Sequence, residues 1–207
     1  MKSLIKLNLN LNYITDYINC SKIINFDNPN IQSKAKEIKS QSTNKLAIIK
    51  SSFEFVRDQI RHSVDVNEEK VTCKASEVLK YEHGICYAKA HLLAALLRVN
   101  NIPAGLCYQK LILNDENPHV FCLHGLNAVY INEIDKWIRL DARGNKPGVN
   151  AEFNLEKEQL AFDVRTNLGE EDYLIIYHEP LPAVVNCLSI YKTTEELFVN
   201  LPREIGV

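Results

Sequence analysis

Apolar residues follow a helical spacing in the first half of the chain. Between Ile31 and His62 they recur three and four positions apart, which predicts helices with one buried face. Residues 85–98 are apolar almost all round and contain strong helix formers, which predicts a helix buried in the middle of the molecule. Two asparagines ahead of Pro103 predict the end of that helix.

The second half of the chain is patterned as strands and turns. The segments predicted as strands are 105–113, 120–131, 137–142 and 173–177, with turns at 114–118 and 132–136 and a loop at 143–148. Residues 72–79 predict a short helix or turn, residues 155–162 and 193–198 predict short helices, and residues 1–30 predict an extended arm. Helices followed by antiparallel strands predict an α+β fold.

The size and charge of the chain narrow its class. With 207 residues, 46% of them hydrophobic, the chain can bury one sizeable core, and we expect a single domain spanning residues 1–207. Its 24 basic and 26 acidic residues give a net charge of −2, which favours neither nucleic acid nor an anionic membrane as a partner. Since no apolar run approaches the roughly 18 residues of a membrane span, a soluble protein is expected.

The six cysteines predict a reducing compartment. They are scattered, with no CxxC pair and no dense spacing of the disulfide-rich secreted type. Residues 1–17 mix leucine and isoleucine with lysine and asparagine and lack the apolar run of a signal peptide. We therefore expect a cytoplasmic protein with free thiols, most of which behave as small buried hydrophobic residues.

Cys86 is the cysteine best placed for chemistry. It follows Gly84 and Ile85 and opens the predicted buried helix, where unpaired backbone N–H groups and the positive end of the helix dipole favour a thiolate. The same N–H groups could bind the oxyanion that forms when sulfur attacks a carbonyl carbon. Cys86 is therefore the predicted nucleophile, although a lone helix cysteine is more often a packing residue.

His124 and Asp141 are the residues predicted to activate this thiol. His124 opens the strand 125–131, and Asp141 closes the returning strand 137–141. If the hairpin turns near Glu133, the two side chains fall almost opposite each other on one face. The predicted roles are sulfur as nucleophile, imidazole as proton acceptor and donor, and carboxylate as the group that orients the imidazole.

Other histidines have plainer interpretations. His83 shares the loop of Cys86 and could line the cleft or be solvated, and His119 follows a proline in a turn. His91 lies on the buried helix, where a core residue with satisfied hydrogen bonds is expected. A zinc site from Cys86, Cys122 and His124 would need a fourth ligand and lacks the paired spacing of structural zinc sites, so neither a metal nor a cofactor is predicted.

Polar and aromatic residues near these positions have two interpretations each. Gln109 could supply a second oxyanion donor or face solvent from its strand. Arg143 and Asn145 could shape a substrate cleft or form a hydrogen-bonded loop. Core or cleft-wall positions are expected for the aromatic residues Tyr87, Tyr108 and Trp137.

These segments resemble the transglutaminase-like superfamily. Gly84-Ile85-Cys86-Tyr87-Ala88-Lys89-Ala90 and Asn101-Ile102-Pro103-Ala104 are similar to its G-x-C helix start and the GIPA-type segment that follows. Residues 124–130, residues 137–142 (Trp-Ile-Arg-Leu-Asp-Ala) and residues 55–61 are similar to its histidine strand, its W-x-x-x-D strand and its preceding helix. The resemblance covers roughly residues 50–145, and it departs at Gly125-Leu126, where a small residue and an aromatic one are usual.

The resemblance implies a papain-like arrangement, with a cysteine-bearing central helix on an antiparallel sheet and Cys86, His124 and Asp141 as the catalytic residues. It implies an enzyme that acts on a peptide, an isopeptide or another small amide or acyl substrate through a thioester. Hydrolysis is the expected outcome, because the sequence shows neither a calcium-loop pattern nor the flanking domains of large calcium-dependent transglutaminases. The alternatives are a protein-glutamine or arylamine-type acyltransferase, although no R-G-G-x-C signature is present, and an inactive binding module that retains the cleft.

Overall fold

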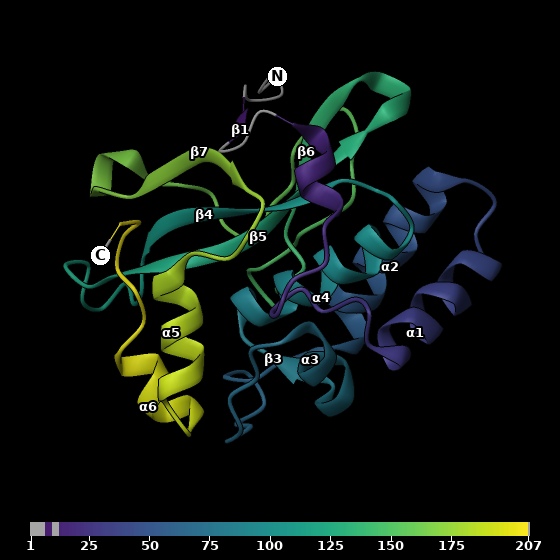
Figure 1. Cartoon of the computed structure of the whole chain (residues 1–207). Helices are drawn as coiled ribbons and strands as arrows, with labels where there is room; N and C mark the ends of the chain where they lie inside the picture. The colour runs from purple at the N-terminus through teal and green to yellow at the C-terminus, as the bar shows by residue number, and fades with distance from the viewer. Residues whose placement is uncertain (1–6, 10–12, 207) are drawn as a thin grey trace.

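The computed structural model describes residues 7–9 and 13–206. Its helices lie mainly on one side of a curled, largely antiparallel sheet (Figure 1). The helices of the first half are α1 (Pro29–Ser40), α2 (Lys45–Gln59), α3 (Ala75–Tyr81) and α4 (Cys86–Val99). The sheet strands are β1 (Asn8–Leu9), β4 (Ala104–Ile112), β5 (Phe121–Ile131), β6 (Lys136–Leu140) and β7 (Glu171–Tyr177). This confirms the predicted α+β fold.

The remaining elements are short. They are the 3₁₀ helices η1 (Ile14–Ile18), η2 (Asn132–Ile134) and η3 (Thr166–Leu168), the strands β2 (Arg61–His62) and β3 (His83–Gly84), and the helices α5 (Pro182–Ile190) and α6 (Thr194–Val199). β2 and β3 pair in parallel and form a separate two-stranded sheet. This small sheet matters for the site because β3 leads directly into α4.

The main sheet has the strand order β1-β7-β4-β5-β6. β4, β5, β6 and β7 pair with antiparallel neighbours, and only β1 joins in parallel, beside β7. Apolar residues of α4 pack against one face, and a smaller cluster around Tyr17, Cys107 and Ile176 covers the other. α4 is therefore buried between the sheet and the other helices, as its all-round apolar sequence predicts.

Several local expectations need correction. The helical segment predicted for residues 31–62 ends earlier, at Gln59, and residues 61–62 form the strand β2. The second of its two helices, α2, is capped by Asn44, which accepts the N–H of Ala47 at 2.8 Å. The N-terminal arm contains the 3₁₀ helix η1 rather than only extended chain, while residues 1–6 and 10–12 of that arm lie outside the described residues. α5 was not predicted, because nine mainly apolar residues starting at Pro182 carry no clear period.

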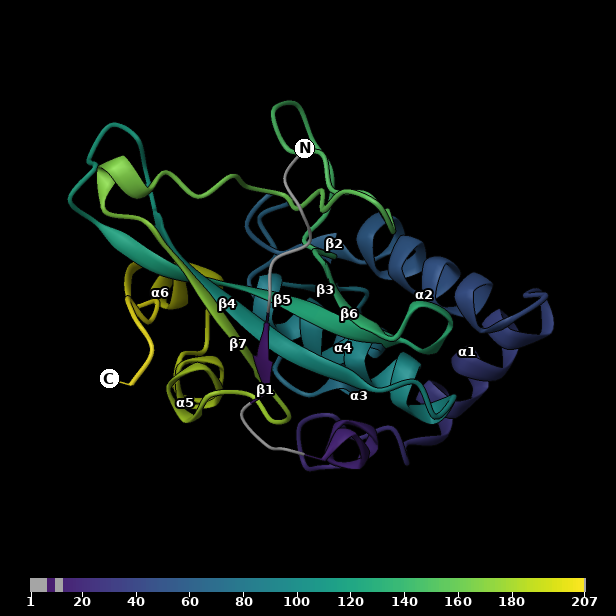
Figure 2. The ribbon, with the colours of Figure 1, turned by 90° about the horizontal axis from the view of Figure 1, so that it is seen from above.

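The predicted helix at 155–162 is wrong. Residues 150–165 instead run as irregular chain alongside the sheet between β6 and β7 (Figure 2). The buried guanidinium of Arg139 in β6 binds the carboxylate of Glu158 in this segment at 2.6 and 2.7 Å, and that of Asp172 in β7 at 2.8 Å. Tertiary ion pairs therefore override the weak local helix preference.

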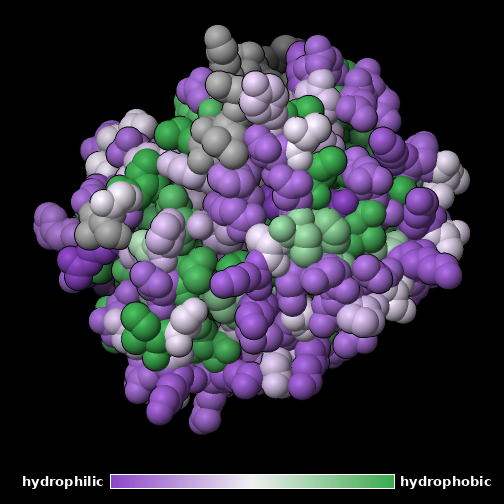
Figure 3. Space-filling view, viewed as in Figure 1, coloured by the Kyte–Doolittle hydropathy of each residue, from purple (hydrophilic) through white to green (hydrophobic). Residues whose placement is uncertain are grey.

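The C-terminal helices expose an apolar surface. On the face shown in Figure 3, hydrophobic residues gather towards the lower left, where α5 and α6 lie in Figure 1. Ile190, Phe198 and Val199 are exposed there. Among residues 7–9 and 13–206, every helix is too short or too polar to cross a bilayer.

Candidate active site

Cys86 is the first residue of α4. The preceding residue, Ile85, has extended backbone (φ −77°, ψ 174°), and within the described chain no side chain caps the first helical turn. The N–H groups of that turn therefore remain available, and they place positive electrostatic potential near the half-buried sulfur. An oxyanion would be stabilised at this position.

Gly125 lets the first turn of α4 approach β5 closely. A Cβ atom at position 125 would lie 2.6 Å from the ring of Tyr87 and 3.3 Å from its Cα. The ring is held in place because its hydroxyl donates to the carbonyl of Leu123 at 2.5 Å. This close approach explains why glycine, rather than a larger residue, follows His124 in this chain.

His124 lies in β5 and hydrogen-bonds to Asp141. Its Nε2 is 2.7 Å from Oδ2 of Asp141, which lies one residue beyond β6. Because an ionised carboxylate only accepts, Nε2 carries the proton and Nδ1 is the nitrogen left for another partner. The pairing of Asn127 with Leu140 means that Asp141 reaches His124 from the loop after β6 and does not stand opposite it in the ladder.

The carboxylate of Asp141 is fully buried and fully engaged. Besides His124, its Oδ2 accepts the N–H of Ala161 and its Oδ1 accepts the N–H of Arg143, both at 3.1 Å. Burial opposes its charge, but the nearby imidazole and these donors lower the pKa of Asp141 below its usual value. The ring of Phe162 packs edge-on against His124 with centroids 5.1 Å apart. The segment 150–165 thus holds the pair in place.

Charge around His124 favours its protonated form. Burial acts to lower its pKa, but the carboxylate of Asp141, through its charge and its hydrogen bond, and the nearby sulfur of Cys86 raise the pKa of His124 to about 10. Cys86 and His124 also line one cavity of about 830 Å³. The arrangement can hold an imidazolium next to sulfur, with a carboxylate behind it.

Cys86 differs from the other cysteines in its surroundings. Burial raises the pKa of Cys73 and Cys187 to about 11 and that of Cys107 and Cys122 to about 12. Cys20 is exposed, and its sulfur is 3.4 Å from the carboxylate of Asp27. Cys86 is the thiol that combines a helix start, a cavity and a neighbouring histidine.

Residues 32–142, more than half of the chain, match the family described as the transglutaminase-like superfamily. The chain belongs to this superfamily. The family segment contains Cys86, His124 and Asp141, and it starts earlier than the similarity recognised at about residue 50. No curated protein is detectably similar to the chain.

Solved structures are similar to this transglutaminase-like protein. A candidate cysteine protease from Cytophaga hutchinsonii has a TM-score of 0.52 and 19% identity over 65% of this chain and 43% of its own. The periplasmic domain of TgpA from Pseudomonas aeruginosa has a TM-score of 0.46 and 16% identity, covering 64% and 48% of the two chains. The chain therefore spans less than half the length of either structure, and the first likeness concerns the fold alone.

The other candidate residues lie elsewhere. His83 is buried and its Nδ1 is 3.0 Å from Ser63 Oγ, while His119 is exposed in a turn, and neither lines the cavity. His91 is a core residue whose Nδ1 contacts the carbonyl of Cys73 at 2.8 Å, but its Nε2 is buried without a partner within the described chain, so the expectation of full satisfaction is wrong. Gln109 pairs with His124 across the sheet.

Gln109 is a poor oxyanion donor in this geometry. Its side chain is buried and does not line the cavity, and it is not exposed to solvent either. Tyr108 is a core residue, and Trp137 packs against Tyr17 on the sheet face away from α4. Within residues 7–9 and 13–206, no three ligand-type side chains are grouped closely enough to hold a metal ion.

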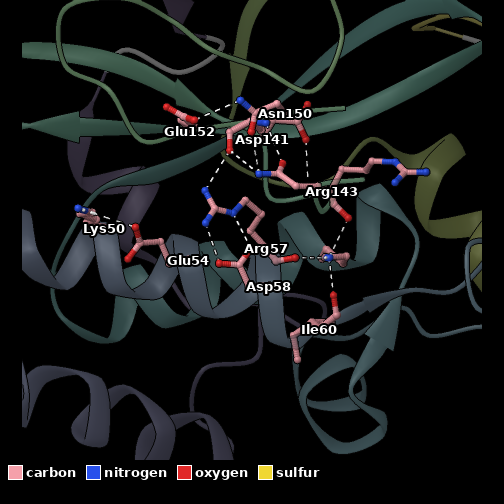
Figure 4. Close-up of polar contacts among 12 residues, drawn as sticks. Lys50, Glu54, Arg57, Asp58, Ile60, Asp141, Arg143, Asn150 and Glu152 are labelled. Atoms are coloured by element: carbon pink, nitrogen blue, oxygen red, sulfur yellow. Dashed lines mark hydrogen bonds and ion pairs between the residues drawn. The ribbon is translucent and has the colours of Figure 1, made fainter. Parts of the chain in front are cut away.

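Lys89 is a site residue that the sequence interpretation missed. Its ammonium, one turn after Cys86 and fully buried, donates to the carbonyls of Ile60 at 2.5 Å, Arg143 at 2.8 Å and Arg57 at 3.3 Å, which come together in Figure 4. Burial and the charge of Arg143 lower the pKa of Lys89 to about 7. It ties α4 to the loop that carries Asp141, and a lysine near the start of a mainly apolar helix was the available signal.

Arg143 also joins this loop to the other side of the cavity. Its guanidinium binds Asp65 at 2.5 and 3.0 Å, and Lys146 binds the same carboxylate at 2.7 Å. These cations lower the pKa of Asp65, although burial acts in the opposite direction. Asn145 holds the loop by accepting the N–H of Ala151 at 2.8 Å. Arg143 therefore both shapes the cleft and belongs to a hydrogen-bonded loop.

Proposed function

We propose that this protein is a cysteine-dependent enzyme that hydrolyses an amide bond of a peptide, an isopeptide or a similar small substrate through a thioester. The observation that carries the proposal is the buried, hydrogen-bonded pair of His124 and Asp141 beside Cys86 at the start of α4. A binding module would have no need of a thiol, an imidazole and a carboxylate in this order. The proposed catalytic residues are Cys86, His124 and Asp141.

The first half-reaction would acylate the enzyme. The thiolate of Cys86 attacks the carbonyl carbon, a C–S bond forms, and the carbonyl oxygen becomes an oxyanion near the N–H groups of the first turn of α4. The imidazolium of His124 then gives its proton to the leaving nitrogen as the C–N bond breaks. Asp141 keeps the ring oriented and balances its charge during this step.

The second half-reaction would release the acyl group to water. His124, now neutral, takes a proton from a water molecule whose oxygen attacks the thioester carbon. The C–S bond breaks, the carboxylic acid leaves, and the thiolate of Cys86 is regenerated beside His124, which keeps the proton from water as an imidazolium. The products are one acid and one amine for each water consumed.

The cavity is suited to a substrate with an apolar group near the scissile bond. Its volume of about 830 Å³ lies within the usual range of small-molecule sites. Leu111, Leu113, Leu197 and Phe198 line part of it, while Asp65, Arg143 and Lys146 line another part. An amide substrate with an apolar side chain fits this division better than a uniformly charged one.

Selective alkylation tests the nucleophile. Brief treatment with iodoacetamide near neutral pH, followed by peptide mapping, should label Cys86 faster than the four cysteines whose thiols are held protonated by burial. Exposed Cys20 provides the internal reference for an ordinary accessible thiol. Labelling of Cys20 with Cys86 protected would falsify the assignment of Cys86 as the nucleophile.

Partitioning of the acyl group tests hydrolysis against transfer. After an acyl donor has been supplied, a labelled cadaverine is added and the products are weighed by mass spectrometry. Free acid should dominate even at millimolar amine, and the ratio should depend weakly on amine concentration. A dominant amine adduct would make the enzyme an acyltransferase while leaving the proposed catalytic residues in place.

A further inference from the structure

His62 lies next to the segment that leads to the nucleophile. It is the second residue of β2, and it pairs with Gly84 of β3, two positions before Cys86. The N–H of Ser63 also donates to the carbonyl of Gly84 at 3.2 Å, so the chain after His62 is held against this segment. The small β2–β3 sheet therefore fixes His62 beside the start of α4.

The ring of His62 borders the cavity of Cys86 and His124. It also lines a smaller adjoining cavity that reaches Lys89. Only 11% of its side chain is exposed, and within residues 7–9 and 13–206 its buried Nδ1 has no hydrogen-bond partner. Its other ring nitrogen, Nε2, is not sealed off in this way and makes no hydrogen bond to the described chain, so Nε2 is the nitrogen that a ligand in the cavity can meet.

The surroundings of His62 keep its ring uncharged. The cations Arg143 and Lys89 and the ring of His124 face it, while the one nearby carboxylate, Asp65, is 3.9 Å from Nδ1 and is already bound by Arg143 and Lys146. Burial, followed by Arg143, lowers the pKa of His62 to about 3. A neutral imidazole has one N–H donor and one acceptor, so its N–H can hydrogen-bond to a carbonyl oxygen and polarise it while the ring stays uncharged.

We propose that His62 is a catalytic residue that donates an N–H hydrogen bond to the carbonyl oxygen of the substrate as that oxygen becomes an oxyanion. The inference rests on the proposed function and deepens it. The backbone N–H groups at Cys86 would provide the other donors, and Gln109, the side chain first considered for this role, does not line the cavity. The small β2–β3 sheet thus holds a proposed catalytic side chain at the edge of the cavity.

Two reactions of the same thiol separate this role from a structural one. p-Nitrophenyl acetate acylates a cysteine through an oxyanion, whereas iodoacetamide alkylates it with no oxyanion at all. Both rates are measured on the full chain, with Cys86→Ala as the background for nitrophenolate release. His62→Leu should slow acylation of Cys86 about 100-fold, the usual effect of losing one oxyanion donor, and should change its alkylation less than about 2-fold.

The matched control is His62→Gln, whose amide keeps an N–H donor, and it should recover much of the acylation rate. If His62→Leu does not fold, His62→Phe retains the ring volume and makes the same comparison. Equal losses of both rates in the donor-free variants, or no loss of acylation, would overturn the inference and leave the proposed function intact. A wild-type protein that releases nitrophenolate no faster than Cys86→Ala would overturn the proposed function, and this inference with it.

Discussion

The two ends of helix α4 each bury a cation that binds backbone carbonyls. At the far end, the guanidinium of Arg98 donates to the carbonyls of Ala104, Asn19 and His178. At the end near Cys86, Lys89 donates to three carbonyls, those of Arg57 in α2, Ile60 just after α2 and Arg143 in the loop after β6. Both cations thus fasten the central helix to segments distant in sequence.

The difference between them lies in the segments they join and in how firmly their charge is held. Burial lowers the pKa of Arg98 only to about 10, so this cation remains charged at neutral pH. Burial lowers the pKa of Lys89 to about 7, so its charge titrates where enzymes commonly work. Arg98 therefore serves the scaffold, while the contact of Lys89 with the loop that holds Asp141 is made by a group whose charge changes near pH 7.

The largest expected effect concerns the end near the cavity. Asp141→Asn should lower turnover about 10³–10⁴-fold, because an amide favours the wrong tautomer of His124 and does not stabilise the imidazolium. The protein should stay folded, with about 1–2 kcal/mol lost. With the amide nitrogen turned towards His124, only the N–H of Ala161 would face another donor, while Arg143 would still donate to the amide oxygen. Turnover and urea unfolding are measured on the same preparation. A variant that works at the wild-type rate, or unfolds like a core mutant, would mean that Asp141 is misassigned.

The next effect concerns the scaffold end. Arg98→Met should lower the free energy of unfolding by about 3 kcal/mol, because buried carbonyls lose their donor. The rate at which iodoacetamide labels Cys86 in the folded protein should not change. Arg98→Lys, which keeps a cation with fewer N–H donors, should have a free energy of unfolding between those of the wild type and Arg98→Met. Slower labelling of Cys86 in Arg98→Met would break the distinction between the two ends.

A pH series sharpens the same comparison. Below pH 7 Lys89 is protonated in both folded and unfolded chains, so the full cost of burying its charge weighs against folding. Between pH 7 and its unfolded value of 10.5, only the unfolded chain binds the proton, and the contribution of Lys89 to the free energy of unfolding rises with pH. The stability lost in Lys89→Met should therefore grow by on the order of 2 kcal/mol between pH 6 and pH 9.

Arg98→Met is the control for that series. The folded and unfolded pKa values of Arg98 are about 10 and 12.5, so its cost should be constant over the same range. The raised pKa of His124 makes the whole protein lose stability as pH rises from 6.5 through about 10, but this contribution is common to the wild type and both variants. Equal pH dependence at the two positions would show that Lys89 does not titrate as proposed.

The smallest expected effect concerns the contact between α4 and β5. Gly125→Ala should cost about 1 kcal/mol, because its Cβ would lie 2.6 Å from a tyrosine ring that is tied to Leu123. It should also slow acylation of Cys86 by moving the first turn of α4. In a Tyr87→Leu background the substitution should cost less, which a double-mutant cycle measures. Additive effects would show that Tyr87 is not the obstacle.

The sequence predicted much of the fold because long elements carry strong patterns. The expected helix 85–98 is α4, Cys86–Val99, and the expected strands 105–113 and 120–131 are β4 and β5, each within one residue at either end. The short segments were less predictable. Residues 155–162 form no helix, because Arg139 of β6 binds the side chain of Glu158 and Asp141, just beyond β6, binds the backbone of Ala161.

For the candidate site, the sequence placed a cysteine at a helix start and a histidine and an aspartate on strands of one hairpin. Their catalytic roles remain a prediction, but the order of the three residues followed from local pattern and family resemblance alone. The register between the strands did not follow, since it depends on the turn, and here Asp141 reaches His124 from beyond the end of β6.

The sequence by itself determined the elements with a strong period, the family, and which thiol opens a buried helix. Only the tertiary structure decided that Lys89 ties that helix to the loop of Asp141 and that His62 lies beside the cavity. Both depend on pairings between segments more than twenty residues apart, such as β2 with β3 and Lys89 with Ile60. No local pattern encodes such contacts, because a buried polar group is positioned by whichever distant backbone can satisfy it.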